Sequence, residues 1–177
     1  MQPLEADAAA WRSELARTGE FRELGQLHYG EALRAERQAA LRRLLAALQA
    51  QPVGGVSLDW QRAAVAGYET GAQAALDLVP DERGWQPRAV IAISPPPMAA
   101  AEAVPPALLI TGDTDGDALG LVTRPAERRR AFETLHPGTG WLLNLPGTSH
   151  AALAGTLAPE GWHAQDQHHG REGAMGG

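Results

Sequence analysis

Short apolar runs alternate along this chain with segments of helical periodicity, and this alternation is the strongest constraint on its fold. The runs occupy 62–67 (RAAVAG), 88–94 (RAVIAIS), 107–112 (ALLITG) and 141–145 (WLLNL). Runs this short and apolar are typical of strands buried on both faces of a parallel sheet. Strands that alternate with helices favour a doubly wound α/β domain. The expected fold class is therefore α/β, a three-layer α/β/α unit with a mostly parallel sheet of about four strands.

The helical segments divide the chain into three parts. The longest, from about Gly30 to Ala50, has an amphipathic pattern whose apolar stripe is Leu33, Leu41, Leu44, Leu45 and Leu48. Shorter helices are expected at about 70–79, 125–135 and 150–156. The first 29 residues are only weakly helical, and the stretch from Pro159 is rich in Gly and His without periodicity. We therefore expect an N-terminal extension (1–29), an α/β core (30–158) and a mobile tail (159–177).

Length and composition exclude several classes of protein. A chain of 177 residues fits one domain, and no apolar run approaches the roughly 18 residues that read as a membrane span. The N-terminus mixes acids and arginines where a signal peptide needs an apolar stretch, so a soluble, cytoplasmic protein is expected. The absence of cysteine excludes disulfides, thiolate metal sites and a Cys nucleophile. The net charge of −6 argues against nucleic-acid binding, and we expect the arginine run 128–130 to be the solvated face of a helix.

The segment Gly67-Tyr68-Glu69-Thr70-Gly71 lies between a predicted strand and a predicted helix. A strand that runs directly into a helix through such a turn presents one residue at the end of the strand, and here that residue is Glu69. Glycines are expected at both flanks because side chains there would collide with the turn. The N-terminus of the following helix favours an anion, which suits a carboxylate.

Two further polar groups follow later strands. The strand at 107–112 runs into GDTDGD, which contains Asp115, and the strand at 141–145 is followed by His150. Because parallel strands end at the same edge of a sheet, these groups are expected near Glu69. Asp113 and Asp117 are interpreted as turn residues, and a turn role is also open for Asp115. A calcium site in GDTDGD is disfavoured because the spaced glutamate of an EF-hand loop is absent.

The order of these three elements resembles the α/β-hydrolase superfamily. VAGYETGAQAAL looks like the nucleophile elbow, PPALLITGDTD like the strand and turn that carry the acid, and LPGTSHAALAG like the histidine loop. The likeness is to the dienelactone-hydrolase and esterase-like branch, and it covers about residues 30–156. It implies that Glu69 takes the nucleophile position, Asp115 the acid position and His150 the base position. Tyr68 and Thr70 would then contact the substrate or its oxyanion.

Two departures from the family pattern leave the function open. A glutamate replaces the usual serine, so Glu69 is a nucleophile, a general base or a static helix-capping carboxylate. The family's earlier strands, with the loop that donates part of the oxyanion hole, have no counterpart before residue 30. The Thr70 amide is then the remaining expected donor. The first hypothesis is a hydrolase of an ester or a related small organic substrate, without cofactor or metal. The alternative is an inactive pseudo-hydrolase or binding module, with a truncated gene product as one form of it.

The remaining candidates receive structural interpretations. Ser94 follows a strand but precedes Pro95, and no helix begins there, so it is not expected to be a nucleophile. The histidines of the tail (His163, His168 and His169) are not expected to form a physiological metal site. The strand at 62–67 would be an edge strand in a domain that begins near residue 30. An exposed edge favours pairing with another chain. A homodimer through this edge is therefore a further expectation.

Overall fold

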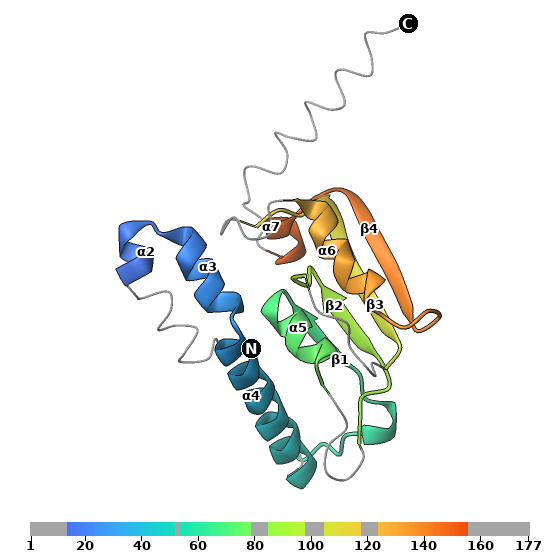
Figure 1. Ribbon diagram of the computed structural model, residues 1–177. Coiled ribbons are helices and arrows are strands. Elements are labelled where there is room, and N and C mark those ends of the chain that lie inside the picture. The colour runs from blue at the N-terminus through green and yellow to red at the C-terminus, as the bar shows by residue number, and fades with distance from the viewer. Residues whose placement is uncertain (1–13, 52–53, 79–84, 98–104, 118–123, 156–177) are drawn as a thin grey trace, which may run out of the picture.

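The computed structural model describes residues 14–51, 54–78, 85–97, 105–117 and 124–155 (Figure 1). These residues form a four-stranded sheet with the order β1-β2-β3-β4, in which all neighbouring strands are parallel. The strands are β1 (Val65–Tyr68), β2 (Val90–Ile93), β3 (Ala107–Thr114) and β4 (Gly140–Ser149). The prediction of an α/β fold with a parallel sheet is confirmed. The tail and its histidines lie outside the described residues.

The helices also follow the sequence pattern closely. Short helices α2 and α3 precede the long helix α4, and α5, α6 and α7 lie in the second half of the chain. Their bounds are α2 (Glu14–Thr18), α3 (Phe21–Tyr29), α4 (Glu31–Ala50), α5 (Thr70–Leu76), α6 (Pro125–Glu133) and α7 (His150–Leu153), with a 3₁₀ turn η1 (Trp60–Arg62) before β1. Pro125 at the start of α6 is favourable because its fixed backbone angle suits the first helical turn.

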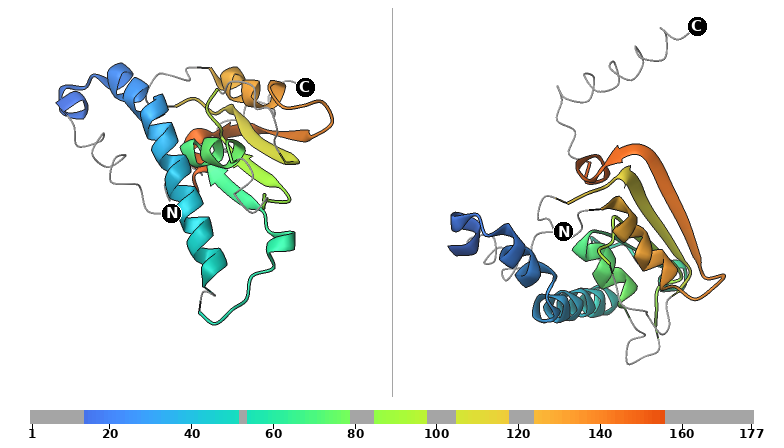
Figure 2. Two further views of the ribbon diagram at one scale, coloured as in Figure 1. Left: turned by 60° about the horizontal axis from the view of Figure 1, so that its bottom comes forward. Right: turned by 45° about the horizontal axis from the view of Figure 1, so that its top comes forward.

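The hydrophobic core lies between one face of the sheet and the helices α5 and α6 (Figure 2). Alternate residues of β2 and β3 point into it, as the two-residue period of a strand requires. Small side chains on α5 let this helix approach the strands closely. The buried members of the core are Ala72, Ala75, Leu76, Val90, Ala92, Ala107, Leu109, Ala131 and Leu135.

The opposite face of the sheet is also apolar but is less covered by the described residues. It carries Ile91 and Leu108 from the central strands, and Trp141 on β4 is 59% exposed. Right-handed crossovers between strands in sequential order place the connecting helices on one face. This explains why the core contains only α5 and α6 among the described helices. The described residues thus give two layers, and the expected third layer stays a prediction.

Helix α4 packs against α5 (Figures 1 and 2). Its apolar stripe is only partly buried: Leu33 is buried, whereas Leu44 is 45% exposed. The main polar attachment is Arg34, whose Nε and Nη2 donate to the Asp77 carboxylate at 2.6 and 2.7 Å. This bidentate pair fixes the N-terminal helices against the end of α5.

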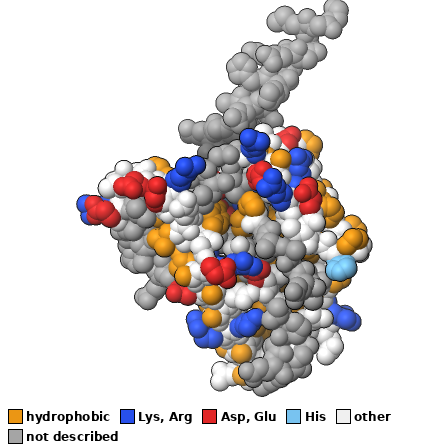
Figure 3. All heavy atoms as spheres, viewed as in Figure 1, with side chains coloured by type: hydrophobic (Ala, Val, Ile, Leu, Met, Phe, Trp, Pro, Cys, Tyr) orange, Lys and Arg blue, Asp and Glu red, His pale blue; other side chains and the backbone are white. Residues whose placement is uncertain are grey.

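The surface agrees with the composition. Acidic and basic side chains are interspersed on the face seen in Figure 3, rather than gathered by sign. Among the described residues, no helix is both long and apolar enough to cross a membrane.

Candidate active site

Glu69 forms the junction between strand and helix by itself. β1 ends at Tyr68 and α5 begins at Thr70. The backbone of Glu69 has φ 51° and ψ −115°, a sparsely populated conformation that costs about 1–3 kcal/mol. It is held by hydrogen bonds on both sides, from Glu69 N to Ile93 O (2.8 Å) and from Gln73 N to Glu69 O (3.0 Å). Such strain, maintained by its surroundings, is common at functional sites.

The two glycines that flank this turn differ in what they contribute. A Cβ at Gly67 would lie 2.1 Å from the carbonyl oxygen of Gly71, so no side chain fits there. A Cβ at Gly71 would meet nothing within 4 Å. The expectation that both positions exclude side chains is therefore right for Gly67 and wrong for Gly71. A side chain at residue 67 would point at the backbone of residue 71, whereas a side chain at residue 71 would point into open space.

The ends of β3 and β4 bring Asp115 and His150 together. The register between these strands shifts between Gly112 and Thr114, and a Cβ at Gly112 would lie 1.9 Å from the Thr148 carbonyl oxygen. The strands can approach this closely only because residue 112 is glycine. His150 begins α7 directly after β4. The irregularity therefore places the imidazole beside the turn that follows β3.

Glu69, His150 and Asp115 form one continuous chain of contacts. His150 Nδ1 lies 2.7 Å from Asp115 Oδ1, and His150 Nε2 lies 3.4 Å from Glu69 Oε1. The two ring nitrogens thus face two different carboxylates. Asp115 is fully buried, whereas the side chains of Glu69 and His150 are 19% and 21% exposed. The structure brings together the three residues that the sequence singled out.

Two hydroxyl groups orient Asp115. Ser94 Oγ donates to Asp115 Oδ1 at 2.8 Å, and Thr111 Oγ1 donates to Asp115 Oδ2 at 2.7 Å. Ser94 is itself fully buried with φ 50°, and its Oγ lies 2.9 Å from His150 Nδ1. Ser94 therefore contacts both members of the Asp115–His150 pair and is not exposed to solvent. The sequence excluded it as a nucleophile but did not predict this supporting contact.

Arg128 corrects one prediction. The run 128–130 was expected to be solvated, but the Arg128 side chain is completely buried, while Arg129 and Arg130 are exposed. Its Nη1 donates to Ser94 O at 2.9 Å. The rest of the guanidinium lies among three carboxylates: Nε is 3.8 Å from Asp115, and Nη2 is 3.6 Å from Asp117 and 4.0 Å from Glu69. Arg128 is buried because these acids compensate its charge.

The contacts among Glu69, His150 and Asp115 shift the pKa values of all three side chains. Burial acts to lower the pKa of His150, but its hydrogen bonds to Asp115 and Glu69 prevail and raise it to about 9. Burial acts to raise the pKa of Glu69, yet the donors His150 and Tyr29 and the charge of Arg128 hold it below its usual value. The pKa of Asp115 is lowered in the same way against burial, by His150, Thr111 and Ser94. At neutral pH an imidazolium therefore lies between two carboxylates.

Two residues from the N-terminal helices complete the surroundings of Glu69. The Tyr29 hydroxyl, at the end of α3, donates a hydrogen bond to Glu69 Oε1. His28 Nε2 lies 4.0 Å from Glu69 Oε2, and Arg37 Nη2 lies 3.3 Å from His28 Nδ1. Since arginine can only donate, Nδ1 of His28 is an acceptor and Nε2 carries the proton. Neither contact was predicted, because residues 1–29 show only a weak helical pattern in the sequence.

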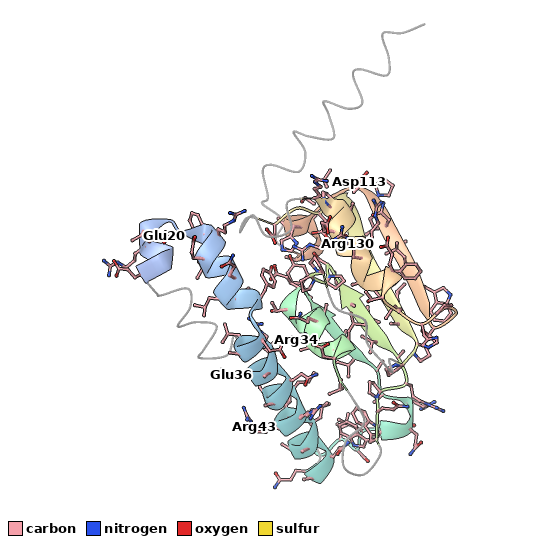
Figure 4. All side chains as sticks on the ribbon, in the orientation of Figure 1. Glu20, Arg34, Glu36, Arg43, Asp113 and Arg130 are labelled. Atoms are coloured by element: carbon pink, nitrogen blue, oxygen red, sulfur yellow. The ribbon has the colours of Figure 1, made fainter. Side chains whose placement is uncertain are left out.

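The other predicted site residues lie at the same edge of the sheet. The Tyr68 hydroxyl donates to the carbonyl oxygen of His150 at 3.0 Å, and the two rings are 5.2 Å apart. Tyr68 thus supports the histidine and does not touch Glu69 through its hydroxyl. Thr70 is the first residue of α5. The interpretation of Asp113 as a turn residue is wrong, because Asp113 lies within β3, where its exposed side chain accepts a hydrogen bond from Gly147 N at 2.7 Å (Figure 4).

The described side chains contain no group of three or more His, Asp or Glu residues arranged to hold a metal ion. No protein-family model matches this chain, and no curated protein matches it.

Proposed function

We propose that this chain is an α/β-hydrolase-like hydrolase that acts on an ester or a related small organic substrate, with Glu69 as its nucleophile. The observation that carries the proposal is the contact chain Asp115–His150–Glu69, with Glu69 on a strained one-residue turn between strand and helix. In covalent catalysis a nucleophile contacts a base that a third group orients. These three side chains have that arrangement.

The charge of Glu69 favours a nucleophile over a general base. An efficient general base has a pKa near the working pH. The pKa of Glu69 is instead lowered, against burial, by the donors around it. Glu69 is consequently ionised at neutral pH and a weak proton acceptor. An ionised carboxylate can still attack an electrophilic carbon and form a covalent ester or anhydride.

The proton on His150 fits a two-step reaction. In the first step an oxygen of Glu69 forms a bond to the substrate carbon, the bond from that carbon to the leaving oxygen breaks, and the leaving oxygen takes the proton of His150. Glu69 is then uncharged, so the influence that raised the pKa of His150 is reduced. The neutral imidazole can next accept a proton from water, whose oxygen attacks the Glu69 intermediate, while Asp115 stabilises the imidazolium that forms.

Glu69→Gln and His150→Ala provide the test, with 4-nitrophenyl acetate and styrene oxide as probes. Glutamine keeps the size of Glu69 but is a poor nucleophile, so turnover of any accepted probe should fall by at least about a hundredfold in both variants. Arg129→Gln is the control, because Arg129 is an exposed residue of α6 next to Arg128. Turnover that survives unchanged in Glu69→Gln would remove the proposal.

The alternative is a pseudo-hydrolase or binding module in which Glu69 and His150 form a static ion pair. It is favoured by one observation, that the imidazolium is already satisfied by two carboxylates. Turnover of either probe that His150→Ala abolishes would exclude this alternative.

We also propose that the chain forms a homodimer through an exposed sheet edge. β1 is an edge strand of the described sheet, as the sequence suggested, and β4 is the other. A monomer mass at micromolar concentration by size-exclusion chromatography with light scattering would contradict it.

A further inference from the structure

The described side chains that donate to Glu69 meet at one of its two oxygens. Tyr29 donates its hydroxyl to Oε1, and the nearest contact of His150 (3.4 Å) is also with Oε1. Arg128 lies 4.0 Å from Oε1 and His28 lies 4.0 Å from Oε2, and both distances are too long for a hydrogen bond. The two oxygens are therefore not equivalent. Oε1 is held, and Oε2 is the oxygen better placed to attack.

Attack by Oε2 determines what Oε1 becomes. In the resulting ester or anhydride, Oε1 is the carbonyl oxygen of Glu69. When water adds to that carbonyl carbon, the electron pair of the C=O bond moves to Oε1, which becomes an oxyanion. The tetrahedral species then collapses, the bond from the Glu69 carbon to Oε2 breaks, and the product oxygen accepts the proton that His150 took from water. The group that already donates a hydrogen bond to Oε1 would therefore also donate a hydrogen bond to this oxyanion.

We propose that Tyr29 is a catalytic residue, the oxyanion donor for hydrolysis of the Glu69 intermediate. This inference rests on the proposed function and adds a donor from a part of the chain that the sequence could not place. Without it, the Thr70 amide would be the sole donor expected. A preorganised donor at the position where negative charge develops is among the largest contributions to catalysis.

The structure holds Tyr29 in place for this role. Tyr29 ends α3, and α4 begins two residues later at Glu31. α4 is attached to the end of α5 by the bidentate Arg34–Asp77 pair, and Gln38 donates a hydrogen bond to the Asp77 carbonyl oxygen. Burial, and then the nearby charge of Glu69, raise the pKa of Tyr29 above its usual range, so the phenol keeps its proton. A phenol that stays protonated remains a donor throughout the reaction.

Tyr29→Phe tests the proposal because it removes only the hydroxyl. The enzyme is mixed with styrene oxide or 4-nitrophenyl acetate, quenched at intervals and analysed by intact-protein and peptide mass spectrometry. We expect a covalent adduct on Glu69 to accumulate in Tyr29→Phe. Its hydrolysis should be slower by roughly 100- to 1000-fold, as for loss of one oxyanion donor. Its formation should change less than tenfold. Thr139→Val removes a hydroxyl from a distant turn and should leave both rates unchanged.

The outcomes separate this inference from the proposed function. Adducts that accumulate in His150→Ala but not in Tyr29→Phe overturn the role of Tyr29 alone. Equal slowing of adduct formation and hydrolysis also overturns it, because a purely structural role would affect both. No adduct in any variant removes the proposed function and this inference with it. If Tyr29→Phe does not fold, 3-fluorotyrosine at position 29 keeps the ring and the hydroxyl as a stronger donor. It should then accelerate hydrolysis of the adduct, and an unchanged rate overturns the proposal.

Discussion

Replacing Arg128 by methionine should destabilise the protein strongly and in a pH-dependent way. Methionine replaces the aliphatic part of the arginine side chain but carries no charge, so the change leaves Asp115, Asp117 and Glu69 around an uncharged side chain. The carboxylates lie 3.6–4.0 Å from the guanidinium. At an effective dielectric constant near 20, each pair has a gross attraction of about 4 kcal/mol. The cost of burying the charges offsets much of this attraction.

The net loss follows from what is left unpaired. Removing one partner from a buried ion cluster typically costs 3–5 kcal/mol, because the remaining charges stay buried. The variant also loses the hydrogen bond from Arg128 to the Ser94 carbonyl oxygen. We therefore expect the free energy of unfolding to fall by about 4 kcal/mol at pH 7.5. With a urea dependence of about 2 kcal/mol per molar, the midpoint should fall by about 2 M.

The loss should be smaller in acid. Arg128 helps to hold the pKa values of Glu69 and Asp115 below their usual range, so both rise in the variant. Depressed carboxyl pKa values stabilise the folded state above the unfolded pKa, and this stabilisation is lost as pH falls. This loss begins near the unfolded pKa values of about 4 and continues as pH falls towards the lowered pKa values of the folded wild type. The wild type therefore loses more than the variant in this range, and the difference in their free energies of unfolding should shrink between pH 7.5 and about pH 3.5.

Urea unfolding followed by circular dichroism at both pH values measures these differences. Arg129→Met is the matched control: Arg129 is the next residue of the same helix and is exposed, so its substitution should change stability by no more than about 0.5 kcal/mol. A loss in Arg128→Met that equals this control, or that is the same at both pH values, would refute the assignment of Arg128 as the compensating charge of the site.

Three further predictions concern the histidine, the turn and the N-terminal attachment. Wild-type stability should fall by up to about 3 kcal/mol as pH rises from 6.5 through 9, because the raised pKa of His150 stabilises the folded state only while it is protonated; a flat unfolding profile over that window would contradict this. Gly67→Ala should cost at least about 1–3 kcal/mol through overpacking, whereas Gly71→Ala should be neutral or stabilising by about 0.5–1 kcal/mol; equal melting temperatures would count against the turn geometry. A double-mutant cycle on Arg34 and Asp77 should give a coupling energy of about 1–3 kcal/mol, and a value near zero would show that this pair does not attach α4.

The strands and the order of the site residues could be predicted because they depend on local signals. The apolar runs before Glu69 and Asp115 had the length and bounding residues of buried strands, and parallel strands end at a common edge. That edge then joined Glu69, Asp115 and His150, which lie far apart in the sequence. Strand ends differed by a few residues, as at β4, which continues to Ser149 because its register shifts against β3.

The rest of the site depends on tertiary contacts that carry no local signal. Arg128 lies in a run of three arginines, and only the acids on neighbouring elements determine which of the three is buried. Tyr29 ends α3, a helix that was not predicted within the first 29 residues, and the attachment of the neighbouring helix α4 depends on the Arg34–Asp77 pair, whose members lie 43 residues apart. Ser94 precedes a proline and resembled an ordinary strand end. Its contacts with Asp115 and His150 depend on the fold, which brings these three residues together.

The central claim is that Glu69 attacks the substrate and that water then hydrolyses the Glu69 intermediate. A single turnover of styrene oxide in ¹⁸O-labelled water, with enzyme in excess, tests it directly through the mass of the peptide that contains Glu69, because the resulting ester has only one carbonyl carbon for water to attack. If water attacks the carbonyl carbon of the intermediate, one ¹⁸O atom enters the Glu69 carboxylate while the product oxygen stays unlabelled. Label found in the product and absent from Glu69 would contradict the account.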